Sequence, residues 1–135
     1  MAKFVATDYA ITIGTADFST SIAAVTLDIS ADEQETTAFG NDYRTRIAGL
    51  KDASLTLDFH QDFGAASVDA TLFPLIGSAI PFTIVPTSAE VGATNPSYSG
   101  TAIVTSYSPF TSSVGDLATL SVTWPVSGAI TRATA

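Results

Sequence analysis

Two segments of alternating apolar and polar residues, 25–30 and 53–60, constrain the fold of this chain more than any other part of its sequence. Successive side chains of a β-strand point to opposite faces of a sheet, so this alternation predicts two strands that each bury one face. The apolar members are Val25, Leu27 and Ile29 in the first segment, and Ala53, Leu55, Leu57 and Phe59 in the second. We expect the two strands to span residues 22–31 and 51–63.

The connection between these strands, residues 32–47, begins with carboxylates and carries two arginines further on. It is too long for a tight hairpin turn, and a long charged connection between two good strands is usually a functional arm or a disordered loop. Gly40 and Asn41 supply turn chemistry within it, because both residue types tolerate positive φ. The residues that an arm would present to a partner are Asp32, Glu33, Glu35, Phe39, Tyr43, Arg44, Arg46 and Ile47.

Four further segments have the composition of strands, and the chain from residue 127 onward either adds a short strand through Ile130 or remains loose. The four segments are residues 9–14, 80–85, 97–107 and 117–126. One helix is predicted over about residues 65–76, with its apolar stripe on one face. The stripe consists of Val68, Leu72, Leu75 and Ile76. Gly77 stands where a C-terminal cap is expected, and Pro74 predicts an irregular last turn.

These elements predict one domain, residues 1–135, with a long loop or arm at 32–47. Its fold class is mainly β: an antiparallel β-barrel or sandwich of six to seven strands with one flanking α-helix. The helix must bury its apolar stripe, and the only available partner is the sheet.

Charge is scarce and unbalanced in this chain. Five Lys and Arg stand against thirteen Asp and Glu, which gives a formal net charge of −8 and argues against a phosphate-binding surface as the main activity. Only 13% of the residues are charged, about half the usual fraction. This deficit indicates either a β protein covered by Thr and Ser or a chain whose faces are largely covered by copies of itself. We find no bilayer-spanning run and no signal peptide pattern.

The residues form no recognisable catalytic or metal-binding pattern. His60, the only histidine, lies on the polar side of its strand beside Asp58 and Asp62, but no nucleophile motif accompanies it. We interpret it as solvated or facing another subunit. The carboxylates from Asp28 to Glu35 lack the spacing of a Ca²⁺-binding loop, and no phosphate loop or dinucleotide fingerprint is present. We therefore expect no enzymatic activity, no cofactor and no bound metal.

Arg44, Arg46 and Lys51 form the one basic cluster, directly after the acidic run of residues 32–35. Two interpretations are open for this charge pattern. It is either a surface loop of mixed charge, or an arm whose acidic half meets the basic half of a neighbouring copy. The second interpretation predicts that charge pairs set the register between subunits.

Several segments carry a resemblance to a known family. They are residues 37–40 (TAFG), Tyr43-Arg44, residues 47–51 (IAGLK) and the strand after them, the helix segment SVDATLFPLIG and the late strand LSVTWPVSG. In this order they resemble the tail tube (major tail) proteins of long-tailed bacteriophages, over most of the chain. The resemblance implies a β-barrel flanked by a helix, six copies joined into a ring, and rings stacked into a hollow tube through which DNA leaves the capsid.

The resemblance also implies that the loop at 32–47 reaches the neighbouring ring. The partners are then other copies of the chain and other phage tail proteins, in the virion and, during assembly, in the host cytoplasm, with no membrane. DNA passes through without specific binding, and an acidic wall suits this because it repels phosphates. The candidate lumen-facing residues are Asp28, Asp58 and Asp62, on the polar faces of central strands.

Two other functions are open. A capsid decoration (cement) protein, which binds the outer surface of the phage head, would also be small, acidic and without catalytic residues. Its partner, however, is the major capsid protein. A carbohydrate-binding β module needs an exposed aromatic platform, whereas the single tryptophan, Trp124, falls on the apolar face of its strand and is expected in the core.

Overall fold

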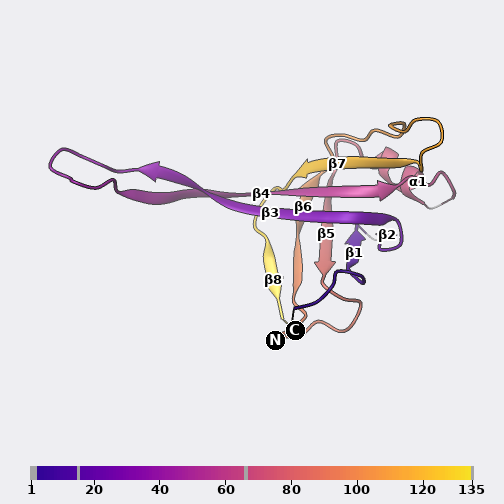
Figure 1. Ribbon diagram of the computed structural model, residues 1–135, viewed down its shortest axis with the longest axis horizontal. Helices are drawn as coiled ribbons and strands as arrows, with labels where there is room; N and C mark the ends of the chain where they lie inside the picture. Colours follow the sequence, from indigo (N-terminus) through magenta and orange to yellow (C-terminus); the bar gives the residue numbers. More distant parts are fainter. Residues whose placement is uncertain (1–2, 15, 66, 135) are drawn as a thin grey trace.

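A computed structural model describes residues 3–14, 16–65 and 67–134, and it shows two antiparallel β-sheets packed as a sandwich with one short helix (Figure 1). The five-stranded sheet has the order β2-β1-β5-β6-β8, and the three-stranded sheet has the order β3-β4-β7. In Figure 1 the strands of the smaller sheet run across those of the larger one. The predicted mainly β, antiparallel fold is confirmed, and of the two predicted architectures the structure shows the sandwich.

The three-stranded sheet contains the two segments with the clearest alternation. β3 (Ile22–Glu35) pairs with β4 (Arg46–His60) over almost their whole length. β7 (Thr119–Pro125) pairs with the other side of β4, over residues 54–60. β3 and β7 are therefore the two outer strands of this sheet, and β4 is its centre.

The inward side chains of the two long strands differ in burial. Leu55, Leu57 and Phe59 of β4 have no exposed surface, as their alternation predicts. Val25 and Leu27 of β3 are only partly buried. The reason is the position of β3 at the edge of its sheet, where its inward side chains lack neighbours on one side.

The five-stranded sheet collects the remaining strands. They are β1 (Ala10–Ile13), β2 (Ala16–Asp17), β5 (Ala79–Val85), β6 (Ser97–Ile103) and β8 (Thr131–Ala133). Three of them match segments predicted as strands, although β6 ends earlier than residue 107. β8 shows that the tail adds a strand, but this strand begins at Thr131, after the predicted Ile130. β2 raises the number of strands above the predicted six to seven; two residues are too short to produce a periodic signal.

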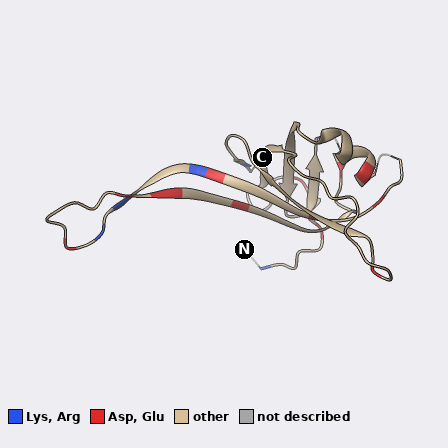
Figure 2. Ribbon diagram, turned by 90° about the horizontal axis from the view of Figure 1, so that it is seen from above, with Lys and Arg blue, Asp and Glu red and all other residues tan. Residues whose placement is uncertain are grey.

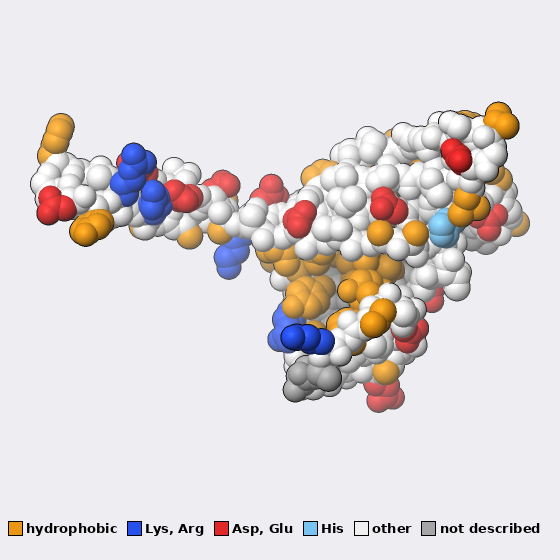
Figure 3. Space-filling view, viewed as in Figure 1, with side chains coloured by type: hydrophobic (Ala, Val, Ile, Leu, Met, Phe, Trp, Pro, Cys, Tyr) orange, Lys and Arg blue, Asp and Glu red, His pale blue; other side chains and the backbone are white. Residues whose placement is uncertain are grey.

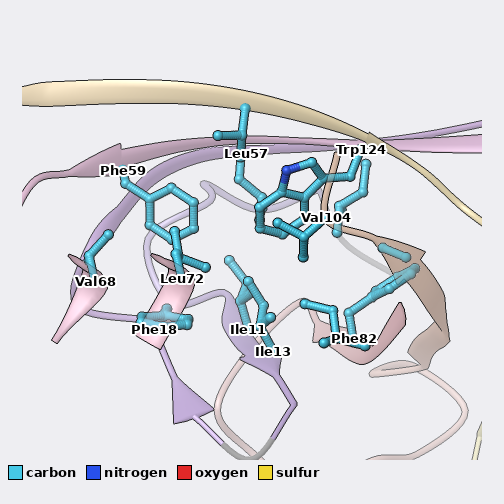
Figure 4. Packing of buried hydrophobic residues seen from close by; sticks show 14 of the residues in the cluster. Ile11, Ile13, Phe18, Leu57, Phe59, Val68, Leu72, Phe82, Val104 and Trp124 are labelled. Atoms are coloured by element: carbon cyan, nitrogen blue, oxygen red, sulfur yellow. The ribbon is translucent and has the colours of Figure 1, made fainter. Parts of the chain in front are cut away.

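Side chains from both sheets and the helix meet in one apolar core (Figure 4). The rings of Phe18 and Phe59 meet edge to face, with centroids 5.6 Å apart, a favoured aromatic arrangement. Trp124 is fully buried, and its Nε1–H donates a hydrogen bond to the carbonyl of Ser106 at 3.0 Å. The predicted core position of Trp124 is confirmed, and this side chain is not available as a sugar-binding platform.

The helical segment is shorter and less regular than predicted. α1 spans Val68–Leu72 and continues as a 3-10 turn, η1, over Phe73–Leu75. Pro74 lies in this turn, which confirms the predicted irregular end. Gly77 adopts a φ of 85°, as expected for a helix cap, whereas Ile76 of the predicted apolar stripe is exposed.

Candidate functional site

The outer halves of β3 and β4 leave the body of the molecule and form a two-stranded ribbon along its longest axis (Figure 1). Every residue from 30 to 52 is exposed, and we call this segment the arm. The predicted connection, 32–47, lies inside it, but only residues 36–45 lie outside the two strands, because β3 continues to Glu35 and β4 begins at Arg46. The sequence did not reveal these strand ends, since a ribbon that buries neither face has no alternating pattern.

Hydrogen bonds close the loop at the end of the arm. The N–H of Thr36 donates to the carbonyl of Thr45 at 2.7 Å, and the side-chain oxygen of Asn41 accepts the N–H of Ala38 at 2.8 Å. Gly40 has a φ of 95°, so the predicted turn chemistry is confirmed. The loop backbone thus has internal partners, and the aromatic side chains of Phe39 and Tyr43 are exposed for contact with another molecule.

Four of the predicted arm residues form two ion pairs across the ribbon. Arg46 Nε lies 2.5 Å from Glu33 Oε1, and Arg44 Nη1 lies 3.5 Å from Glu35 Oε1. One of the two interpretations of this charge pattern expects such pairs between neighbouring copies. The structure forms them within one copy, diagonally across the ribbon, because the register places Glu35 opposite Arg46 and Glu33 opposite Ala48. Asp32, also a predicted arm residue, is exposed where the pairing of β3 and β4 is irregular.

Large apolar side chains are exposed along the same arm. Phe39 is fully exposed, and Tyr43, Ile47 and Leu50 expose 86%, 61% and 82% of their surfaces. Several large apolar side chains exposed on one projecting segment indicate a contact region. Three of these residues belong to the predicted arm set. Leu50 does not, because an apolar residue close to a predicted strand gives no sequence signal that distinguishes exposure from burial.

The outer face of the three-stranded sheet is polar and free of basic residues. No Lys or Arg occurs in residues 22–30, 53–60 or 119–125. Ser and Thr dominate this face, and the hydroxyls of Thr56 and Thr123 lie 3.2 Å apart in a hydrogen bond between strands. Figure 2 shows that Lys and Arg are concentrated on the arm instead.

Two of the three predicted lumen-facing carboxylates share this polar face. Asp28 of β3 is exposed and Asp58 of β4 is partly exposed. Asp62 lies elsewhere, because β4 ends at His60 and not at the predicted residue 63. The carboxylate of Asp62 accepts the N–H of Gly64 at 2.8 Å, so this side chain shapes the connection to α1.

Both outer strands of this sheet have a side without a partner strand in the described part of the chain. The start of β7 is covered, since the hydroxyl of Thr111 donates to the Thr119 carbonyl and the Thr119 N–H donates to Ser112 Oγ at 3.0 Å. β3 contains neither Lys nor Pro, the residues that often block a strand edge. Unblocked edges of this kind are templates for pairing with another chain.

Other polar clusters are local. Across residues 3–14, 16–65 and 67–134, no three Asp, Glu or His side chains come together as a metal site. None of the described helices has both the length and the apolar character needed to cross a membrane. The pKa values of Asp8 and Asp17 are lowered because each carboxylate accepts hydrogen bonds from the hydroxyl and N–H of a serine, Ser88 and Ser19 respectively.

The same fold occurs in a solved structure described as "Virion of native gene transfer agent (GTA) particle". A chain of that structure superposes with a TM-score of 0.73, over 93% of this chain and 95% of its own length. The sequences are 14% identical, so the likeness establishes a shared fold. No protein-family model and no curated protein sequence matches the chain.

Proposed function

We propose that this chain is a structural virion protein that self-assembles into hexameric rings, stacked as the tail tube of a phage-like particle. The tube is the conduit for DNA ejection. The observation that carries the proposal is the three-stranded sheet, which combines a polar face without Lys or Arg, a projecting arm and two outer strands that each lack a further partner strand in the described part of the chain. The occurrence of the same fold in a chain of a gene transfer agent virion supports it.

Ring closure uses the two outer strands of this sheet. β3 and β7 are both antiparallel to β4, so the β7 edge of one copy can lie parallel to the β3 edge of the next. A contact between two different edges is heterologous, and repeated contacts of this type close into a ring when the rotation between copies allows it. The low charge content of the chain agrees with faces that are covered in an assembly.

The polar face of the same sheet lines the lumen in this proposal. It presents Asp28 and Asp58 without a Lys or Arg in residues 22–30, 53–60 or 119–125, and Asp62 lies beyond the end of β4. A negative wall repels the phosphates of DNA, so DNA passes through without specific binding. The ring is built from a single tail-tube-like β domain, residues 1–135.

The arm joins copies in adjacent rings, and other phage tail proteins bind the ends of the tube. The apolar residues Phe39, Tyr43 and Ile47 of the arm supply the contact area. The charges of the arm add specificity to this contact. Glu33 with Arg46 and Glu35 with Arg44 form pairs within one copy, and Asp32 is exposed without an ion pair to a described residue. Assembly takes place in the host cytoplasm, and the product is part of the virion.

Negative-stain electron microscopy of the purified protein at rising concentration tests the proposal. Rings with a central hole, or stacked tubes, are the expected result. Persistent monomers, or trimers that bind only to preformed capsids, would contradict it and support a capsid decoration protein instead.

The lumen assignment has its own test. Asp58→Lys places a cation on the polar face, and Glu90→Lys makes the same charge change in the exposed loop after β5. We expect tubes of the Asp58→Lys variant to retain short double-stranded DNA in a salt-dependent manner, and tubes of the Glu90→Lys control to retain as little as the unmodified protein. Equal retention by both variants would place Asp58 outside the lumen.

A further inference from the structure

An open groove runs beside β3, between this strand and the face of the five-stranded sheet. It consists of three adjoining hollows of about 370, 340 and 510 Å³. The first and second share Tyr9 and Val25, and the second and third share Ile29 and Tyr98, so the groove is continuous. Figure 3 shows hydrophobic side chains gathered in the hollow below the arm-bearing sheet.

The walls of the groove are mainly apolar in its middle part. Leu27 and Ile29 line it from β3, and Ile84 and Tyr98 line it from the five-stranded sheet. These side chains are partly buried or exposed and belong to the incompletely packed edge of the sandwich. Hollows of this size are large enough for an aromatic side chain from another molecule.

Two cations stand at the end of the groove where the arm begins. Lys51 and Arg132 both line this end, together with Asp52. In the described part of the chain the ion pairs are those of Arg44 and Arg46 in the arm, and neither Lys51 nor Arg132 takes part in one. Asp52 offsets one of these two cations, so the groove offers an apolar wall with a formal net charge of +1 beside it.

The tip of the arm has the complementary character. Phe39 and Tyr43 are exposed on either side of Asp42, whose carboxylate forms no ion pair with a described residue. The paired strands of the arm hold this tip away from the body of its own chain (Figure 1). The tip therefore cannot reach the groove of the same copy.

We propose that the groove beside β3 is the docking site for the arm tip of a second copy, with Phe39 and Tyr43 against its apolar wall and Asp42 toward Lys51 and Arg132. This inference rests on the proposed assembly, and it identifies the contact that the arm makes with a copy in the adjacent ring. The ring contact uses the backbone edge of β3. Docking uses the side chains that β3 directs into the groove.

A second apolar surface, at the end of the molecule that carries α1, is a poorer match for the tip. There the rings of Phe63 and Phe110 stack with centroids 5.5 Å apart, and Val114 is fully exposed. The chain has no Lys or Arg from residue 52 to 131, so the formal charges near this surface are carboxylates such as Asp116. They would repel Asp42, whereas the groove attracts it.

Cysteine cross-linking tests the docking directly, because the chain contains no cysteine. Ala38→Cys marks the tip and Ala129→Cys marks the groove, and both leave the proposed contact residues unchanged. Two singly substituted chains with tags of different size are mixed, assembled and oxidised, so that a mixed disulfide reports a contact between copies. Val114→Cys replaces Ala129→Cys in the matched control, which marks the surface near α1.

The expected result is a mixed disulfide between the tip and groove variants, at least about tenfold more abundant than in the Val114→Cys control. Asp42→Lys in the tip chain should reduce the yield about tenfold, and Lys51→Glu with Arg132→Glu in the groove chain should restore it. Tubes that form but cross-link at Val114→Cys, or at neither position, would overturn the docking site and leave the proposed function intact. A chain that stays monomeric at every concentration would overturn both.

Discussion

Shortening the arm separates its role in assembly from the stability of the body. The change deletes residues 32–50 and joins the paired residues Ala31 and Lys51 by Asn-Gly, the sequence preferred in two-residue hairpin turns. Every deleted residue is exposed, so no buried side chain is lost. The two ion pairs that disappear are worth about 0.2–1 kcal/mol each. We expect the free energy of unfolding to change by about 1 kcal/mol.

Leu57→Ala, in the buried half of the same β4 strand, is the matched control. Leu57 has no exposed surface, and truncation of such a side chain costs about 2–5 kcal/mol. At roughly 4 °C per kcal/mol for a chain of this length, the control lowers the Tm by roughly 8–20 °C and the shortened arm lowers it by roughly 4 °C.

Differential scanning calorimetry of the dilute protein measures both effects, and electron microscopy at high concentration measures assembly. The shortened chain should keep its cooperative transition and fail to form stacked tubes. A Tm loss as large as that of Leu57→Ala would show that the arm contributes to the core. Stacks of undiminished length would show that the arm does not join copies.

Three further predictions concern the body of the molecule. Trp124→Phe removes the indole N–H that bonds to the carbonyl of Ser106, and it should lower the free energy of unfolding by about 1–3 kcal/mol. Chemical denaturation measures this change, and an unchanged midpoint would contradict the role of the hydrogen bond. Gly100→Ala places a Cβ 2.8 Å from Ile130 Cδ1 and should lower the free energy of unfolding by about 1–3 kcal/mol. Ile130→Val removes that Cδ1 atom, so the double variant should recover part of the loss. Equal stability of the single and double variants would refute the clash. The hydroxyl and N–H of Ser19 donate to Asp17 and lower the pKa of this carboxylate. These hydrogen bonds therefore stabilise the folded state above pH 3.8, and the stabilisation is lost as the pH falls through the folded pKa. NMR titration should show Ser19→Ala raising this pKa toward 3.8, and no change would contradict the assigned cause.

The buried part of the smaller sheet could be predicted from sequence because one face of the sheet lies on the core and the other faces solvent. The apolar residues of β4 face a core and its polar residues face solvent, so the alternation records the architecture directly. The same argument placed Trp124 correctly in the core. The helix was predicted too long, since Pro74 converts its end to a 3-10 turn and Ile76 does not reach the core.

The arm shows where this kind of prediction stops. The length and charge of the connection predict a functional arm or a disordered loop, and they do not predict its paired strands, because an exposed ribbon has the same environment on both faces. The pairing of Arg46 with Glu33 within one copy depends on the register of two strands, which neighbouring residues in the sequence do not specify. The sequence pattern also places Asp62 on a strand face, whereas β4 ends at His60 and the Asp62 carboxylate accepts the N–H of Gly64 in the following connection.

The amino-acid sequence alone therefore determined the class of fold, the strands that meet in its core and the segment that projects from it. These features follow from local alternation and turn chemistry, because apolar side chains are driven out of water and polar side chains stay in it. The groove beside β3 follows only from how two sheets cross and leave an edge strand half covered. Its cations, Lys51 and Arg132, lie far apart in the chain and are brought to one end of the groove by separate sheets. Such a juxtaposition is a property of packing between distant segments, and no local pattern encodes it.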